Sequence, residues 1–165
     1  MFDPGSRRAY PVDMAYVTQE ARQELLDSIA EAIERIGVAL AALGTAYEQL
    51  DENTADRLEE ELFRPVQVAY GRAQRTHAGF AERHGLPGRS FEPAAPGRAS
   101  QGVKSLLEDA VDAVDEADEV LVELQDSMRP VEVGDAQLRA GLSEVRELLG
   151  ALRGRARELV RVLGR

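Results

Sequence analysis

The sequence predicts an all-α protein: an antiparallel up-down-up-down four-helix bundle with coiled-coil-like heptad seams and one long loop between its second and third helices. Apolar residues recur in alternating steps of three and four along four separate stretches, as on a helix face that packs against other helices. No stretch shows the two-residue alternation that is typical of a half-buried strand. The 165 residues are enough for a single domain, residues 1–165, with a continuous core.

The first predicted helix follows an N-terminal extension, residues 1–16. Asp13 or Thr18 is a suitable cap, because a short polar side chain can accept a hydrogen bond from the free backbone N–H groups at the start of a helix. The apolar seam then continues without a break and comprises Leu26, Ile29, Ile33, Ile36, Leu40, Leu43, Tyr47 and Leu50.

The second predicted helix begins at a cap formed by Asn53-Thr54. Pro65 lies inside it, lacks a backbone N–H and would clash with the carbonyl of Glu61. We therefore predict a bend or interruption between Glu61 and Val66. The seam of this helix comprises Phe63, Val66, Tyr70, Ala73, His77, Phe80 and His84.

The third and fourth predicted helices are separated by two breaking residues, Pro130 and Gly134. Ser100 can cap the third helix and Asp135 the fourth. The third seam comprises Val103, Leu107, Ala110, Val114, Ala117, Leu121, Leu124 and Met128. The fourth comprises Leu138, Leu142, Val145, Leu149, Leu152, Ala156, Leu159 and Leu163.

The order of the helices depends on the Pro/Gly-rich loop of residues 85–100. At about 3.3 Å per residue this loop could cross the whole bundle, so the topology is open on length alone. Stacking the seams in an up-down-up-down order places large residues of one helix against alanines of the others, which a close-packed interior favours. That order predicts a layer formed by Ile33, His77, Ala110 and Ala156.

Composition excludes several classes of function. The chain has no cysteine, so disulfides, thiolate zinc sites, iron–sulfur clusters and cysteine nucleophiles are excluded. A net charge of −10 argues against nucleic acid as a partner, because duplex binding depends on neutralising phosphates. No apolar run is long enough to span a bilayer and the first residues lack a signal-peptide core, so we predict a cytoplasmic protein with no membrane partner. Lys104 is the single lysine among 20 basic residues, which with the abundant Ala and Gly indicates a GC-rich bacterial genome.

The candidate chemistry is sparse, and we predict no cofactor, no metal and no catalytic residue. His77 and His84 lie about 10.5 Å apart along a helix, too far to bind one ion together. His77 is expected to be a core histidine, hydrogen-bonded to a neighbour. The acids of the third helix fall on flanking and outer faces, as on a solvated surface; they are Asp112, Asp115, Glu116 and Glu119.

Charge is distributed unevenly along the chain. Residues 48–61 are strongly acidic, whereas residues 62–104 and 150–165 are rich in arginine. In an up-down-up-down bundle these arginines would gather at one end. The long loop would then fold Leu86 or Phe91 over a terminal layer formed by Leu26, His84, Val103 and Leu163. The binding residues predicted for the basic end are Arg83, His84, Arg89, Phe91 and Arg98.

Two functions remain open. The first is a non-enzymatic helical interaction module that binds a protein partner or itself as a homo-oligomer. Long helical faces without a catalytic constellation favour it, and the fold class alone carries much of this hypothesis. The second is a small-anion-binding sensor or enzyme whose site lies at the basic end near His84.

Overall fold

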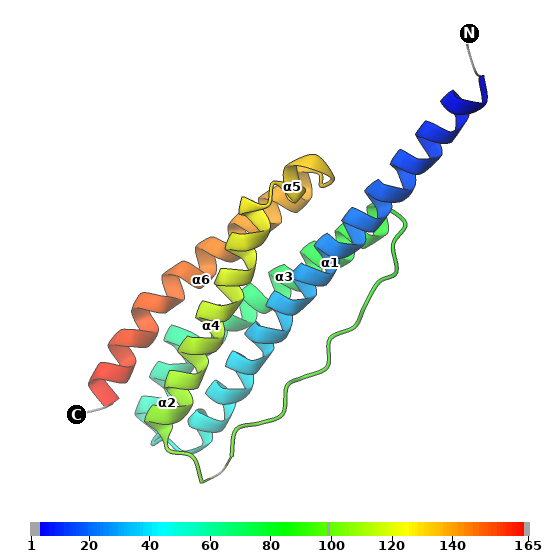
Figure 1. Ribbon diagram of the computed structural model, residues 1–165. Helices are drawn as coiled ribbons and strands as arrows, with labels where there is room; N and C mark the ends of the chain where they lie inside the picture. The colour runs from blue at the N-terminus through cyan, green and yellow to red at the C-terminus, as the bar shows by residue number, and fades with distance from the viewer. Residues whose placement is uncertain (1–3, 99, 164–165) are drawn as a thin grey trace.

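The computed structural model describes the backbone of residues 4–98 and 100–163, and their side chains from residue 15 onward. Over these residues the chain is all-α and forms an antiparallel four-helix bundle with a long loop, which confirms the predicted class (Figure 1). The elements in order are α1 (Pro4–Glu48), α2 (Glu52–Leu58), a π-helix (Glu59–Phe63), α3 (Arg64–Arg83), α4 (Val103–Asp126), α5 (Arg129–Glu132) and α6 (Ala136–Leu163).

Neighbouring helices run antiparallel, as predicted. α1 packs against α3 and α4, and α6 packs against the same two helices. On α1, Arg35 pairs with Glu116 in the middle of α4, whereas Glu24, nearer the start of α1, pairs with Arg129 beyond the end of α4. Residue numbers therefore increase along α4 in the direction in which they decrease along α1, so the two helices are antiparallel.

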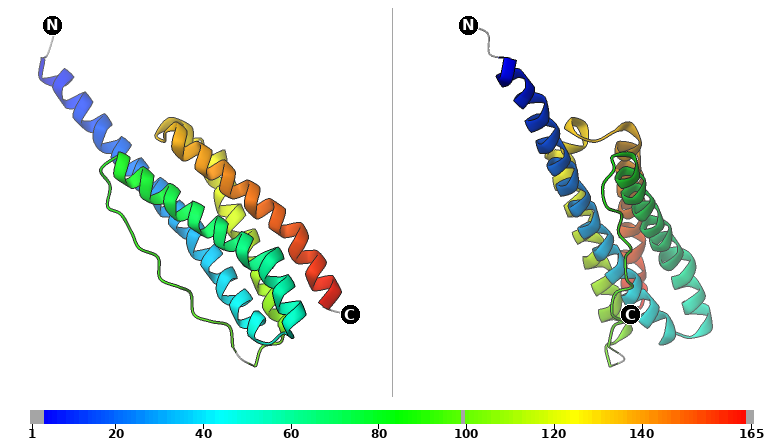
Figure 2. Two further views of the ribbon diagram at one scale, coloured as in Figure 1. Left: turned by 180° about the vertical axis from the view of Figure 1, so that it is seen from behind. Right: turned by 90° about the vertical axis from the view of Figure 1, so that its right-hand side faces the viewer.

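The order in which the chain connects the four long helices differs from the predicted order. Arg83 at the end of α3 pairs with Asp135 at the start of α6, so α3 and α6 are antiparallel neighbours, and α3 and α4 run in the same direction. Residues 84–102 cross the length of the bundle to connect them, so the topology is up-down-down-up (Figure 2). The argument from residue volumes could not separate the two orders, because both give antiparallel neighbours and alanine-rich seams fit together in more than one register.

The predicted layer around His77 is accordingly wrong. Its neighbour Thr76 lies against Gly141, where an added Cβ would be 2.4 Å from the Thr76 hydroxyl oxygen. Ala156 is about 22 Å further along α6, at 1.5 Å per residue. Ala110 and Ala156 do meet, but around a small cavity that Leu43 and Leu62 also line.

The interruption predicted near Pro65 is present. The backbone N–H of Arg64 donates to the carbonyl of Glu59, five residues back, in the π-helix. Pro65 itself falls in the first turn of α3, where its missing N–H costs least. The hydrogen bonds of the π-helix join residues five apart and widen this turn, which relieves the clash of the Pro65 ring with the Glu61 carbonyl.

Helix starts agree in part with the predicted caps. Asp135 caps α6, because its Oδ1 accepts from the Leu138 N–H at 2.8 Å. Asp51 rather than Asn53-Thr54 caps α2, and Gly102 rather than Ser100 precedes α4. α1 already includes residues 4–16, the predicted extension; residues 1–3 of that extension lie outside the described residues. A helix nucleated by packing propagates outward cheaply, since each added residue gains one hydrogen bond.

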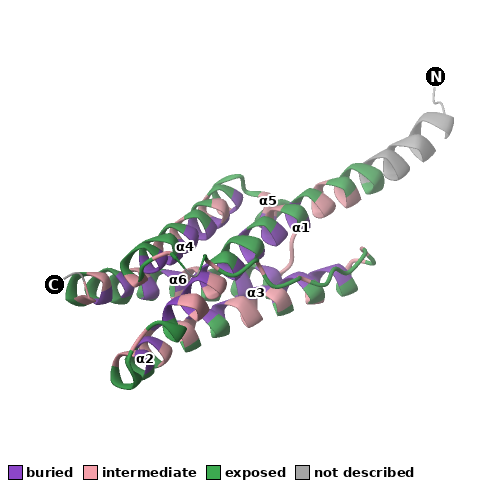
Figure 3. Cartoon of the chain, turned by 90° about the horizontal axis from the view of Figure 1, so that it is seen from below, coloured by how far each residue is buried: buried purple, intermediate pink, exposed green. Residues whose placement is uncertain are grey.

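The core is a continuous cluster of leucine, isoleucine, valine and alanine contributed by all four long helices, and it also contains Phe80. Figure 3 shows buried residues facing the interior of the bundle and exposed residues on its outer surfaces. Among the described residues, no helix has the length and apolar character needed to cross a membrane.

Candidate functional site

The predicted binding residues do not form one cluster. Arg83 and His84 lie at the end of α3, whereas Arg89 and Phe91 lie on the long loop as it runs along the bundle. Arg98 is near the other end of that loop, one residue after Gly97, which contacts α1 at Thr45. The predicted grouping of Arg83, Arg89 and Arg98 at one end of the bundle is therefore wrong. A loop that crosses the bundle spreads its arginines along the length of the bundle.

Arg83 and His84 surround a single carboxylate, that of Asp135. Arg83 donates from Nε at 2.7 Å and from a terminal nitrogen at 2.8 Å, and His84 Nε2 lies 2.9 Å away. The hydrogen bonds from Arg83 hold the pKa of Asp135 far below its ordinary value of 3.8, and those from the Leu138 N–H and His84 act in the same direction. This cluster joins the end of α3 to the start of α6, and the Arg83 guanidinium and the His84 ring are already occupied by an internal carboxylate.

The basic end predicted for the bundle is not formed. Arg153 of α6 pairs with Asp115 and Asp118 near the middle of α4, and the end of α6, with Arg157 and Val160, lies beside Glu108 and Asp112 in the first half of α4. The C-terminal half of α6 also packs near the acidic π-helix. The arginines of α6 and those at the end of α3 therefore lie at opposite ends. The topology mixes basic and acidic segments that the predicted order would have separated.

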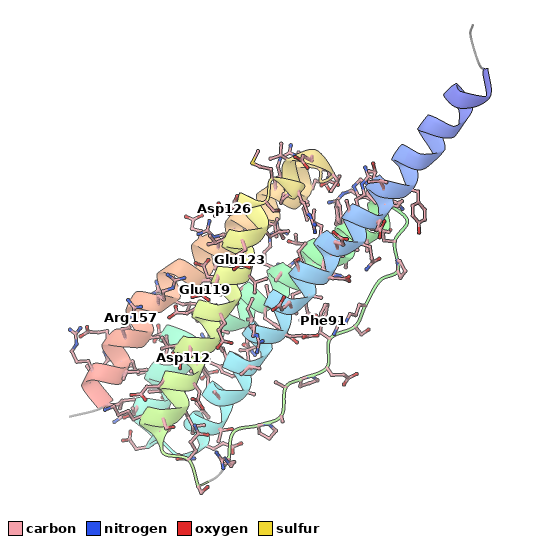
Figure 4. All side chains as sticks on the ribbon, viewed as in Figure 1. Phe91, Asp112, Glu119, Glu123, Asp126 and Arg157 are labelled. Carbon is pink, nitrogen blue, oxygen red and sulfur yellow. The ribbon has the colours of Figure 1, made fainter. Side chains whose placement is uncertain are left out.

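An ion network between α4 and α6 was missed by the sequence reasoning. Asp118 is buried and accepts from Arg146 Nε at 3.1 Å and from Arg153, with Gln125 also bound to Arg146 at 2.8 Å. The signal was present, because Asp118 stands four residues after Val114 and three before Leu121, on the apolar face. The acids named from the sequence behave as predicted: Asp112, Glu116 and Glu119 are exposed, and Asp115 is half-buried against Arg153 (Figure 4).

The long loop forms a strap, which we define as residues 86–98, that runs along α1 and α3 (Figures 1 and 2). The strap, α1 and α3 together line a groove. Leu86 and Phe91 pack against the core, so apolar docking of this loop is confirmed. The predicted terminal layer is not formed, because His84 and Val103 stand at the two ends of the crossing. Phe91 instead lies along the side of the bundle and contacts His77, with the ring centroids 5.3 Å apart in an edge-to-face arrangement (Figure 4).

His77 is a buried histidine of α3, as expected, but within the described part of the chain the expected hydrogen bond to a neighbour is absent at its Nδ1. Its Nδ1 is buried and has no hydrogen-bond partner among the described residues. Burial lowers the pKa of His77 below its ordinary value of 6.5, and the charge of Arg89 acts in the same direction, against a smaller opposite effect of Asp27. The imidazole is therefore neutral at physiological pH.

Open space remains on both sides of the strap. One cavity of about 590 Å³ lies between α1, α3 and the strap, with Tyr70 in its wall and Gly37 and Gly71 beside it. A second, of about 300 Å³, lies on the other side of Phe91 and reaches Glu34 and Arg89. Burial raises the pKa of Tyr70, so its phenol is protonated and can donate a hydrogen bond.

The start of α1 extends beyond the rest of the bundle, and we define residues 4–18 as the overhang (Figure 1). Gln19 and Arg22 are tied to the bundle by hydrogen bonds to the carbonyls of His84 and Val133. Immediately before them, Tyr16 is 71% exposed and Val17 is 62% exposed. Two neighbouring large apolar side chains are thus presented to solvent where the helix loses its partners.

The described residues contain no group of three or more histidine, aspartate or glutamate side chains arranged to hold a metal ion. Comparison with family models, curated proteins and solved structures finds no match to this chain. The site must therefore be interpreted from its geometry, which offers two surfaces: the overhang of α1 and the groove beneath the strap.

Proposed function

We propose that the protein is a non-enzymatic helical interaction module that binds a partner protein or a second copy of itself through the overhang of α1. The observation that carries this proposal is the exposure of Tyr16 and Val17 on a helix that continues beyond its neighbours. The overhang is about 22 Å long at 1.5 Å per residue, enough for four turns of helix to pack against another helix.

Helix physics supports this role. Helices of this length are marginal in water alone, and most helical stability comes from packing an apolar face. Exposed large apolar residues are normal when they stand singly, but a contiguous pair on an unsupported helix is typical of a surface that a partner covers. A helix laid against this segment would shield both side chains and provide the packing that the bundle does not.

The alternative function, a small-anion site near His84, lacks a supporting observation. Asp135 occupies the guanidinium of Arg83 and the imidazole of His84 together, so an external anion would have to displace an internal carboxylate with ideal geometry. The cytoplasmic location and the exclusion of nucleic acid and membrane as partners stay predictions from composition.

A site-specific photo-crosslinker tests the proposal. Placed at Tyr16, it should give a discrete cross-linked product, either a dimer of this chain or an adduct with one partner protein. The matched control is the same crosslinker at Val68, which is 54% exposed on α3 of the bundle. Light scattering over a concentration series separates the dimer from the partner. The proposal is wrong if position 16 cross-links no more than position 68 in the cells that make the protein.

A further inference from the structure

The strap is held on the bundle by few contacts. The Arg89 guanidinium pairs with the Glu34 carboxylate of α1 and lies 4.9 Å from the centre of the Phe91 ring. The Phe91 ring in turn contacts buried His77 of α3. Further along, the Gly97 N–H donates to the Thr45 hydroxyl at 3.1 Å. Arg89, Phe91 and the Gly97 N–H thus make the polar and aromatic contacts described for the strap, and Leu86 adds an apolar contact with the core at its start.

The strap has no regular structure of its own. From residue 87 to residue 98 the described backbone is neither helix nor strand, and most of its side chains are exposed. The backbone hydrogen bonds at its two ends, from Leu86 to Ala81 and from Gln101 to Arg98, do not extend into this stretch. The segment therefore lies in the groove as an extended peptide would.

The groove is larger than the segment that occupies it. Cavities of about 590 and 300 Å³ remain beside Phe91, and both are walled by α1, Tyr70 of α3 and the strap itself. Gly37 and Gly71 line this space and have no side chains to fill it. A Cβ on Gly37 would lie 3.5 Å from the Tyr70 ring. Both spaces are open to solvent, so they are depressions beside the strap that a further segment of chain can enter.

We propose that this groove binds an extended peptide segment of a partner protein that carries an arginine followed two residues later by an aromatic residue, and that the strap is the built-in competitor of that segment. The chemistry of the partner follows from what the groove already accepts: a guanidinium at Glu34, a ring against His77, and the arginine stacked on the ring. Asp27 lies on α1, as Glu34 does, and acts electrostatically on His77. Its negative charge favours a basic segment in the groove.

Covalent attachment gives the strap a strong advantage over a partner. A tethered segment acts at an effective concentration on the order of millimolar, so a free peptide must bind well or the strap must be weakened before exchange is seen. This surface is separate from the overhang of α1, so the proposal stands or fails independently of the proposed function.

The test uses the strap sequence itself as the probe. A fluorescent peptide with the sequence of residues 85–100 is titrated into the full-length chain carrying Arg89→Ala and Phe91→Ala, and its anisotropy is followed. The matched peptide has alanine in place of the arginine and the phenylalanine. The first peptide should bind the opened variant at least about tenfold more tightly than the matched peptide does, a difference of about 1.4 kcal/mol, and more tightly than it binds the wild-type chain. Adding Glu34→Gln to the opened variant should weaken that binding.

Far-ultraviolet circular dichroism and a thermal melt establish that the opened variant is folded. If it is not, Arg89→Ala with Phe91→Leu serves in its place, because leucine keeps an apolar side chain against the core while the ring that contacts His77 is removed. A folded opened variant that binds neither peptide overturns the proposal. Equal binding of the two peptides also overturns it, because the arginine and the ring would then play no part in recognition.

Discussion

Replacement of Gly141 by alanine tests the packing of α3 against α6, and with it the topology. A Cβ at this position would lie 2.4 Å from Oγ1, 2.8 Å from Cγ2 and 3.1 Å from Cβ of Thr76. Rotating Thr76 about χ1 moves its oxygen and methyl group but leaves Cβ in place. Rotation would also break the hydrogen bond that the Thr76 hydroxyl donates to the Arg72 carbonyl at 2.8 Å.

The expected magnitude follows from opposing effects. Alanine in place of glycine stabilises a helix interior by about 1 kcal/mol. Overpacking a buried contact costs about 1–3 kcal/mol, and losing the Thr76 hydrogen bond costs about 1 kcal/mol more. Gly141→Ala should therefore lower the free energy of unfolding by about 1–3 kcal/mol. The matched control is Gly150→Ala in the same helix, where no atom lies within 4 Å of the added Cβ, and it should raise that free energy by about 0.5–1 kcal/mol.

Urea unfolding followed by circular dichroism measures both changes, and the melting temperatures should move in opposite directions by about 2–4 °C per kcal/mol. In a Thr76→Ala background the cost of Gly141→Ala should fall, because the hydroxyl and methyl groups at 2.4 and 2.8 Å are gone and only the Cβ contact of 3.1 Å remains. Equal stabilisation by the two alanine substitutions would refute the close approach of α3 to α6 at this point.

Three further predictions concern ionisable groups. Asp118→Ala leaves Arg146 and Arg153 without their shared buried partner and should lower the free energy of unfolding by about 1–2 kcal/mol in urea titrations, whereas Glu116→Ala, which removes an exposed ion pair with Arg35, should change it by less than about 0.5 kcal/mol. The pKa of His77 is lower in the folded chain than in the unfolded chain, so on acidification the unfolded chain binds a proton at this residue at the higher pH. The free energy of unfolding of the wild type should therefore fall as the pH falls below 6.5, by at most about 1.4 kcal/mol per pH unit. His77→Leu should abolish this contribution to the pH dependence in parallel melts. The pKa of the Asp135 carboxyl is also lowered in the folded state, so its charged form stabilises the fold at pH values above its ordinary pKa of 3.8. Asp135→Asn should lower the free energy of unfolding by about 1–2 kcal/mol at neutral pH. If this loss does not shrink as the pH falls below 3.8, the charged contact with Arg83 is contradicted.

The four helices could be predicted because the three- and four-residue steps are a local property of the sequence. Their order could not, since every seam is apolar and both orders place antiparallel helices side by side. The residue that decides the matter is Gly141: its missing side chain admits Thr76, and a glycine in a helix does not reveal from sequence which neighbour it approaches. The start of α1 was also beyond prediction, because polar residues such as Thr18 can cap a helix or continue one.

Apolar docking of the long loop was predicted, but the place where it docks was not. Phe91 was expected to dock because it is a large apolar residue in an otherwise polar loop, and it does. Its partner His77 could not be foreseen, because that contact depends on where along the bundle the loop crosses. Asp118 shows the opposite case: its helical spacing was enough to place it on the buried face, but its ion network was missed.

The up-down-down-up order has a consequence for how the chain reaches its native state. Arg22 and Val133, which are joined in the bundle, are 111 positions apart in the sequence, and Arg72 and Glu144 are 72 apart. Contacts of such long range slow folding, because loop closure precedes any gain in packing. During synthesis at about 5–20 residues per second, α1 and α3 emerge several seconds before α4 and α6 can cover them. The newly made first half therefore exposes a long apolar face, and any protein that associates during synthesis meets this face before the bundle closes.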